Sequence, residues 1–341
     1  MTKEYALTSK VKWGIISTAN INSRLIPGAH ASSKLELIGV ASRDRARADA
    51  YARRWEVPRA YGTYEDMIED PEIEAVYISL PNNLHCEWTI KSVQGGKHVL
   101  CEKPLTRRAA DAEAVFEAAE RNGRLVSEAF MYRHHPQTKR VANLVAEGAI
   151  GELRLVRAIF SYALYDETNI RLRADAEGGA LMDVGCYCVN GSRLLAGEPE
   201  SVAARAWYGP TGTDWVFAAT MKFPNNTLGL FYCGTALPAR DELEAIGSEG
   251  SVFVEDPWFC RKPIIELRRN GGLERIEIAP EDPYRLELEN LSDAIRGEGE
   301  LLLGRDDALG QARALQALHR SATGAERTGG NDRSPRSHRR L

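Results

Sequence analysis

The sequence predicts an α/β chain in which a doubly wound parallel sheet is followed by an α+β part with a largely antiparallel sheet. Its 341 residues exceed the roughly 250 to 300 at which a single core stops growing, so two domains are expected. Short apolar runs alternate with helix-like segments as far as about residue 126. From about residue 200, longer segments of alternating polarity are separated by turn residues, which indicates antiparallel strands.

The first part contains five apolar runs that are typical of buried parallel strands. These runs cover residues 11–17, 35–42, 75–81, 98–104 and 124–130. Helices are expected between them at 44–54, 64–68 and 108–122. The third helix carries its apolar residues on one stripe, and Asn122-Gly123 ends it because both residues tolerate the left-handed conformation.

After Pro136 the pattern changes. We expect a helix at 137–147, an extended segment at 152–164 and a helix led by glycine at 179–195. Alternating segments follow at 201–209, 215–223, 227–235, 242–256 and 264–278. Turns such as Pro224-Asn225-Asn226 separate consecutive strands. Two amphipathic helices, at 286–296 and 307–322, close the fold.

Composition excludes several classes of function. A net charge of -4 gives no electrostatic reason to bind nucleic acid, and no apolar run approaches the roughly 20 residues of a membrane helix. The N-terminus lacks a secretory pattern, so we expect a cytoplasmic protein. The six cysteines have no CxxC or Cys/His spacing, so we expect no disulfide and no metal site. The basic tail, residues 326–341, is expected to be disordered.

The turn after the first strand lies where a dinucleotide-binding chain places its phosphate-binding glycines. The spacing G-x-G-x-x-G/A falls on Ser17, Ala19 and Asn22, and none of these is glycine. Serine and alanine are small, so the backbone amides can still approach a pyrophosphate, with the hydroxyls of Ser17 and Thr18 adding contacts. An ordinary strand-to-helix turn is the alternative, and the turn taken alone favours it.

Four further segments occur in order: SLPNNLHCEW (79–88), GKHVLCEKPL (96–105), EAFMYRHHP (128–136) and GGALMDVGCYCVNGSRLLAGEP (178–199). Together they resemble the Gfo/Idh/MocA family of NAD(P)-dependent sugar oxidoreductases, over about residues 11–323. The resemblance implies an N-terminal Rossmann domain at 1–133 and a C-terminal domain at 134–325. It also implies that the C-terminal domain has an open sheet for contacts in a homodimer or a higher homo-oligomer, and that the active site lies between the domains.

Two residues narrow the branch of the family. Where much of the family has the motif D-x-G-x-H-x-x-D, this chain has Tyr187 and Asn190. With these two residues, the chain resembles the branch that contains glucose-fructose oxidoreductase, D-xylose dehydrogenases and dimeric dihydrodiol dehydrogenases.

The expected cofactor is NADP(H), with NAD(H) as the alternative. The second strand ends in Ser42-Arg43, a hydroxyl and a guanidinium that suit a 2′-phosphate. Asp44 is expected to open the next helix rather than to bind a ribose hydroxyl. His85 is placed in a loop beside the cofactor, with a packing role as the alternative. The cofactor-binding residues expected from these features and from the resemblance are Ser17, Thr18, Ala19, Asn20, Ile21, Ser42, Arg43, Leu80, Pro81, Asn82, His85, Glu102 and Lys103.

Asp183 and Tyr187 are four residues apart in an expected helix, so both side chains leave one face. Lys103 follows the carboxyl end of a strand, where ligands of open parallel sheets lie. The resemblance gives these three residues a catalytic role. Tyr187, assisted by Lys103, would move the hydroxyl proton, and Asp183 would hold the sugar hydroxyls or orient Lys103.

The energetics of the Lys103–Tyr187 pair are adequate for this role. Making tyrosine a base at neutral pH needs about 4 kcal/mol, which an ammonium about 4 Å away supplies at an effective dielectric near 20. Substrate contacts are expected from Arg171, Arg173 and Tyr187, with a surface ion pair as the alternative for either arginine.

The sequence therefore predicts an NADP-dependent dehydrogenase or reductase. It would transfer a hydride between nicotinamide and a hydroxyl or carbonyl carbon of a sugar or cyclic polyol. The alternative is a dinucleotide-sensing regulatory protein without turnover, since the family that the chain resembles also contains one. The presence of Lys103, Asp183 and Tyr187 favours the enzyme.

Overall fold

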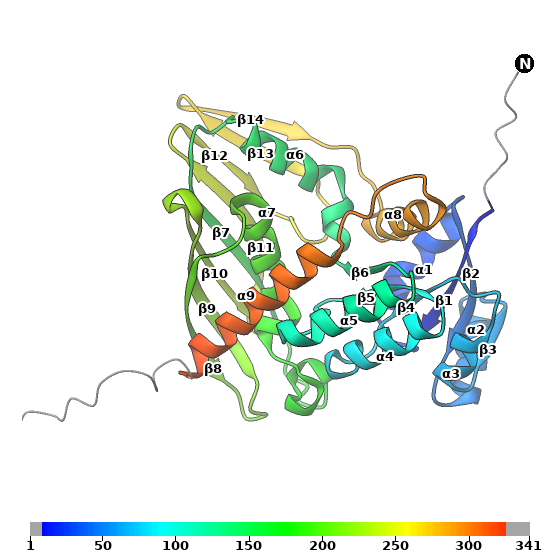
Figure 1. Ribbon diagram of the computed structural model, residues 1–341. Coiled ribbons are helices and arrows are strands. Elements are labelled where there is room, and N and C mark those ends of the chain that lie inside the picture. The colour runs from blue at the N-terminus through cyan, green and yellow to red at the C-terminus, as the bar shows by residue number, and fades with distance from the viewer. Residues whose placement is uncertain (1–8, 325–341) are drawn as a thin grey trace, which may run out of the picture.

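The computed structural model describes residues 9–324, which form two sheets with helices around and between them (Figure 1). The predicted disordered tail lies outside the described residues. The first sheet is parallel and has the order β3-β2-β1-β4-β5-β6, which is that of a dinucleotide-binding Rossmann fold. Its strands are β1 (Val11–Ile16), β2 (Leu35–Ala41), β3 (Arg59–Tyr61), β4 (Ala75–Ile78), β5 (His98–Glu102) and β6 (Val126–Ala129).

Helices cover both faces of this sheet, which is why its central strands are almost entirely apolar and buried. The helices that follow the strands are α1 (Asn22–Ala31), α2 (Arg45–Arg54), α3 (Tyr64–Glu69), α4 (Asn82–Gln94) and α5 (Ala109–Arg121). A helix from the far end of the chain, α8 (Pro283–Arg296), packs beside α1 on the same sheet. The Trp13 indole nitrogen donates to the Ser292 hydroxyl at 3.1 Å and fixes this contact.

The second sheet has the strand order β14-β13-β12-β11-β7-β10-β9-β8. Within it β7 and β10 pair in parallel, and the other neighbours are antiparallel. The prediction of a largely antiparallel second sheet is confirmed. Its strands are β7 (Leu153–Ala163), β8 (Ser201–Tyr208), β9 (Asp214–Lys222), β10 (Leu228–Gly234), β11 (Ala236–Gly247), β12 (Gly250–Val254), β13 (Ile264–Arg269) and β14 (Gly272–Glu277).

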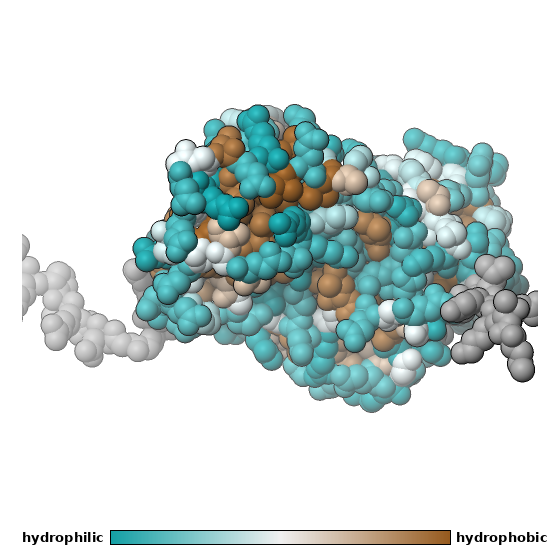
Figure 2. Space-filling model, turned by 90° about the horizontal axis from the view of Figure 1, so that it is seen from above, coloured by the Kyte–Doolittle hydropathy of each residue, from teal (hydrophilic) through white to brown (hydrophobic). Residues whose placement is uncertain are grey.

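The two faces of the second sheet differ. Helices α6 (Pro136–Ala146), α7 (Cys186–Ala196) and α9 (Arg305–Thr323) lie on the side that faces the first sheet, and the opposite face is open (Figure 1). Seen from above, apolar residues gather on the half of the molecule that holds this sheet, within a mostly hydrophilic surface (Figure 2). The helix-covered face of the second sheet looks toward the first sheet. Lys103, directly after β5, therefore meets Asp183, in the turn before α7.

Two local predictions differ from the structure. The sequence predicts a loop after the strand at 75–81, whereas Asn82 begins α4 directly after Pro81. The buried face of α4 mixes His85, Thr89 and Ser92 with apolar residues, so its helical period is weak. The helix predicted at 179–195 begins instead with a π-helical turn, Leu181–Gly185, before α7.

Candidate active site

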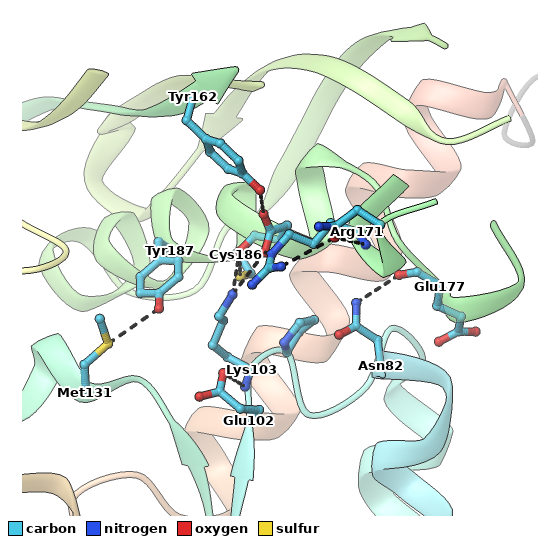
Figure 3. Close-up of polar contacts among 12 residues, drawn as sticks. Asn82, Glu102, Lys103, Met131, Tyr162, Arg171, Glu177, Cys186 and Tyr187 are labelled. Carbon is cyan, nitrogen blue, oxygen red and sulfur yellow. Dashed lines mark hydrogen bonds and ion pairs between the residues drawn. The ribbon is translucent and has the colours of Figure 1, made fainter. Parts of the chain in front are cut away.

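Lys103 follows β5, and its side chain reaches the start of α7 (Figure 3). Its Nζ donates to the main-chain oxygen of Asp183 at 2.7 Å and lies 3.5 Å from Asp183 Oδ1. The two side chains are only 14% and 12% exposed, so water screens this ion pair weakly. Burial by itself lowers the pKa of Lys103, but the Asp183 carboxylate and neighbouring acidic groups raise it above its usual value. Lys103 therefore stays an ammonium at neutral pH.

The backbone that carries Asp183 is fixed by Asp214, at the start of β9. Oδ2 of Asp214 accepts a hydrogen bond from the Leu181 main-chain nitrogen at 2.7 Å. Gly179 precedes this turn with a φ of +123°, and a Cβ there would lie 2.0 Å from Asp214 Oδ1. Only glycine fits that approach. No motif in the sequence marked Asp214, because its partner lies 33 residues away along the chain.

The Asp183 carboxylate has a separate partner at each oxygen. Oδ1 accepts from Arg171 Nε at 3.2 Å, and Oδ2 accepts from the Tyr162 hydroxyl at 2.5 Å (Figure 3). Burial raises the pKa of Asp183, but Lys103 and Arg171 outweigh it and bring the pKa below its usual value. The group is therefore a carboxylate. Tyr162 was not among the predicted residues, and its place near the end of β7 gave no signal beyond strand alternation.

The two predicted substrate arginines separate. Arg171 lies in a short 3-10 turn, Ile170–Leu172, and contacts Asp183 while its side chain stays 42% exposed. Arg173 forms an ion pair with Asp175, and both of these side chains are largely exposed. Arg173 therefore forms the surface ion pair that was the alternative for either arginine. Arg171 instead lies beside Lys103 and Asp183.

Tyr187 contacts Lys103 through its ring rather than through its hydroxyl. Lys103 Nζ lies 5.0 Å from the ring centroid, and the hydroxyl contacts Met131 Sδ at 3.5 Å (Figure 3). Burial raises the pKa of Tyr187 well above its usual value, so the phenol is protonated. The expected pairing of ammonium and phenol oxygen is absent here, because the Tyr187 hydroxyl lies against Met131 and its ring faces Lys103. The ring is held by the aromatic side chains of Phe130, Tyr132, Phe160 and Trp258.

Asn190, the second departure from the family motif, is fully buried. Its Oδ1 accepts from the Tyr132 hydroxyl at 2.6 Å and from Arg133 Nη1 at 3.0 Å. Tyr132 and Arg133 directly follow Met131 in the 3-10 turn Met131–His134. The Asn190 amide therefore fixes α7 to the segment that the Tyr187 hydroxyl touches.

Ser17 occupies the first glycine position with a φ of +113°, which L residues rarely adopt. Its hydroxyl lies 2.8 Å from Ser79 Oγ and accepts from the Ala19 main-chain nitrogen at 3.1 Å. Asn22 donates to the Ser17 main-chain oxygen at 3.0 Å and accepts from the Ser79 hydroxyl at 2.6 Å. Contrary to the expectation of a phosphate contact, the Ser17 hydroxyl serves the turn. These side chains stabilise a conformation that glycine adopts freely.

The remaining residues of the turn fit a dinucleotide. Thr18, Ala19, Asn20 and Ile21 are at least partly exposed, at the carboxyl end of β1. No side chain caps the start of α1, whose first main-chain nitrogens, those of Asn22, Ser23 and Arg24, donate to the main-chain oxygens of Ala19, Asn20 and Ile21. A helix that starts directly after a parallel strand directs the positive end of its dipole to the place where dinucleotide-binding folds hold the pyrophosphate.

At the end of β2, the prediction that Asp44 opens the next helix is confirmed. Asp44 caps α2, because its Oδ1 accepts from the Arg47 main-chain nitrogen at 3.1 Å. Ser42 is buried and its Oγ accepts from the Asp44 main-chain nitrogen at 3.3 Å. Arg43 is exposed at this strand end.

Beside β4, the first turn of α4 carries Asn82 and His85. Asn82 Nδ2 donates to the main-chain oxygen of Glu177 at 3.0 Å (Figure 3). The His85 ring is buried, with its nitrogens 2.9 Å from the Pro104 oxygen and 2.7 Å from the Leu80 oxygen. His85 thus connects the end of β4, at Leu80, to the segment after Lys103, at Pro104. In this structure its ring has the packing role that was the alternative.

Glu102, directly before Lys103, points into the first sheet. It accepts hydrogen bonds from the Tyr77 hydroxyl and, at 3.2 Å, from the Lys103 main-chain nitrogen. Burial raises its pKa above the usual value despite the nearby Lys103 charge. Glu102 therefore connects the end of β5 to Tyr77 on the neighbouring strand β4.

Comparison with known families accounts for both sheets. Residues 11–130 match the model of the GFO_IDH_MocA oxidoreductase family with an NAD-binding Rossmann fold, and residues 138–253 match the GFO/IDH/MocA C-terminal domain. The chain belongs to the Gfo/Idh/MocA family. As a member it is an oxidoreductase with a nicotinamide dinucleotide-binding domain, and the predicted family and fold are confirmed.

Members of the Gfo/Idh/MocA family match this chain over nearly its full length. An uncharacterized oxidoreductase of Rhizobium meliloti is 38% identical over 92% of this chain and 97% of its own. A D-xylose 1-dehydrogenase (NADP(+)) of Haloferax volcanii is 35% identical over 92% of this chain and 98% of its own. The solved structure of a 3-ketoreductase, KijD10, from Actinomadura kijaniata in complex with NADP and TDP-benzene is 28% identical. It matches with a TM-score of 0.85, over 92% of this chain and 98% of its own.

Within residues 9–324, no helix has both the length and the apolar character to cross a membrane. In the same part of the chain, His, Cys, Asp and Glu side chains do not gather in threes as metal ligands would.

Proposed function

We propose that this protein is an NADP-dependent oxidoreductase that interconverts a hydroxyl and a carbonyl group on a sugar or cyclic polyol. The observation that carries the proposal is the meeting of Lys103, Asp183 and Tyr187 between the two sheets. An ammonium, a carboxylate and a phenol at the carboxyl end of β5 suit proton transfer beside a bound dinucleotide. The named activities of the relatives, a xylose dehydrogenase and a 3-ketoreductase, are of the same reaction type.

When bound, the nicotinamide accepts or supplies the hydride. The residues that would hold the dinucleotide lie at the ends of β1, β2, β4 and β5. They are Ser17, Thr18, Ala19, Asn20, Ile21, Ser42, Arg43, Leu80, Pro81, Asn82, His85, Glu102 and Lys103. Ser17 and His85 would act through the backbone that they position, because their side chains are engaged by the protein.

Tyr187 exchanges the substrate proton. Its phenol, kept protonated by burial, gives a proton to the carbonyl oxygen in the direction of reduction. Lys103 stabilises the negative charge that develops on that oxygen. Asp183 keeps Lys103 charged and in place, and Arg171, which is partly exposed beside it, binds a substrate hydroxyl. Arg173 would meet the substrate only after leaving Asp175.

The preference for NADP rests on Arg43. It is exposed at the end of β2, and Asp44, the acidic group nearby, is used as a helix cap. A guanidinium without a carboxylate competing for the ribose favours a 2′-phosphate.

One experiment tests the activity. Purified protein is mixed with NADP or NAD and a panel of aldoses, polyols and trans-dihydrodiols, and the absorbance of reduced nicotinamide is followed. Keto-sugars with NADPH test the reverse direction. We expect turnover with one chemical group of the panel and a higher kcat/KM with NADP than with NAD. Tight binding of NADPH without turnover of any compound would favour the regulatory alternative.

We further propose that the open face of the second sheet forms a homodimer contact. On this face Arg157 bridges Glu242 at 2.6 Å and Glu244 at 3.0 Å, and Tyr232 on β10 is half-buried. Trp207, at the end of β8, is 58% exposed. Light scattering after gel filtration is expected to give twice the mass of the chain, and Tyr232→Glu is expected to shift it to the monomer mass. A monomeric wild type at micromolar concentration contradicts the proposal.

A further inference from the structure

We propose that Tyr162 is a positioning residue of the reaction, whose hydroxyl orients the Asp183 carboxylate and thereby places Lys103. This proposal rests on the function proposed above, since it assigns a role to Tyr162 in the same site. Tyr162 reaches Asp183 from β7, which belongs to the second sheet, whereas Lys103 approaches from the first (Figure 3). The three groups thus connect the two halves of the molecule.

The geometry divides the two carboxylate oxygens of Asp183 between different donors. The Tyr162 hydroxyl occupies Oδ2 at 2.5 Å, while Arg171 Nε at 3.2 Å and Lys103 Nζ at 3.5 Å face Oδ1. The terminal torsion of an aspartate is broad and nearly two-fold, so its oxygens exchange places easily when nothing distinguishes them. The Tyr162 hydroxyl distinguishes them.

A carboxylate beside two cations has two competing positions. If Asp183 turned fully toward Arg171, Lys103 would keep only the main-chain oxygen of Asp183, at 2.7 Å. With Oδ2 held by Tyr162, Oδ1 remains between the two cations. Lys103 then keeps both its hydrogen bond and its ion pair, over the ring of Tyr187.

Tyr162 acts through Asp183 and is distinct from the proton donor. Burial, together with the neighbouring Asp183 charge, raises the pKa of Tyr162 above its usual value, so its proton stays on the phenol. That proton is directed at Oδ2, so it is engaged in holding the carboxylate. Tyr187 has no such acceptor, since its hydroxyl contacts only a thioether sulfur among the described residues.

The test is a double-mutant cycle with Tyr162→Phe and Asp183→Asn in the full-length protein. The Phe variant removes one oxygen atom and keeps the ring. We expect kcat to fall about 10- to 100-fold with Tyr162→Phe, while the Kd of NADPH, measured by fluorescence titration, stays within about twofold. In the Asp183→Asn background, Tyr162→Phe is expected to change kcat less than about threefold, because the group it orients has been replaced. Tyr208→Phe, on β8 and outside the site, is the matched control.

A pH profile separates positioning from a general effect on packing. Tyr162 lowers the pKa of Asp183 through its hydrogen bond, so its removal shifts the acid limb of kcat/KM to higher pH. Equal fold losses in the two backgrounds, or an unchanged acid limb, would overturn the role of Tyr162 and leave the proposed function standing. A wild type without turnover on any substrate overturns both. Unfolding curves of each variant identify losses that arise from instability.

Discussion

The ammonium of Lys103 lies over the ring of Tyr187, 5.0 Å from its centroid, and donates its hydrogen bond to the main-chain oxygen of Asp183. The phenol oxygen points the other way, to Met131. Lys103 and Tyr187 are therefore placed independently, Lys103 by Asp183 and Tyr187 by the surrounding aromatic side chains. Because different neighbours hold the two side chains, separate substitutions test the contribution of each.

Replacement of Lys103 by methionine is expected to lower kcat by about 10²- to 10⁴-fold, since the charge that assists proton transfer is lost. Asp183 keeps Arg171 and Tyr162 as partners, so the fold is expected to survive. Steady-state kinetics and thermal unfolding measure the two effects. Lys91→Met, on the exposed side of α4, is the matched control. Near-normal turnover of Lys103→Met would remove Lys103 from the mechanism.

Replacement of Tyr187 by phenylalanine is expected to lower kcat by about 10²- to 10⁴-fold. The free energy of unfolding should change by less than about 1 kcal/mol, because a thioether sulfur is a weak hydrogen-bond acceptor. Kinetics and urea unfolding of the same preparation check both. A variant that keeps wild-type kcat shows that another group exchanges the proton.

Ser17 has two opposing features, a strained φ and a hydroxyl that serves the turn. Ser17→Gly relieves the backbone and loses the hydrogen bonds, whereas Ser17→Ala loses the hydrogen bonds and keeps the strain. We therefore expect the alanine variant to be less stable than the glycine variant by about 1 kcal/mol. Urea unfolding compares them, and an alanine variant as stable as the glycine variant contradicts the assignment of strain.

Arg43→Ala is expected to raise the KM for NADP by about 10- to 100-fold and to leave the KM for NAD nearly unchanged. The lost contact is a hydrogen bond between a guanidinium and a phosphate, worth about 1.5 to 3 kcal/mol. Arg45→Ala, on α2 and paired with Asp49, is the control. A parallel rise for both dinucleotides would show that Arg43 does not contact the 2′-phosphate.

Asp214 makes stability depend on pH. Burial raises its pKa to about 7, so the folded state binds this proton more tightly than the unfolded state does. This contribution to stability is present below about pH 4 and is lost as the pH rises toward 7, by at most about 4 kcal/mol. Asp214→Asn keeps an oxygen for Leu181 and removes the titration, so its unfolding free energy should decline less between pH 4 and 7. Urea curves across that range measure the difference, and parallel pH profiles for the two proteins contradict it.

Much of the fold was predictable because its signals are local. Apolar runs predict the parallel strands, and turns such as Pro224-Asn225-Asn226 predict the hairpins of the second sheet. The helix at Asn82 was missed because polar residues occupy its buried face. Spacing predicted that Asp183 and Tyr187 leave one face, and the resemblance to the family, rather than any spacing, associated them with Lys103, which contacts both in the structure.

The sequence by itself determined the two-sheet organisation, the family and the residue types of the site, since these depend on periodicity and on motifs. Only the tertiary structure decided the partners. It turned the Ser17 hydroxyl toward Ser79, placed Lys103 over the Tyr187 ring and brought Tyr162 to Asp183. The physical reason is that such contacts join strands and helices far apart in the chain. Their geometry follows from how the two sheets pack, which no local pattern encodes.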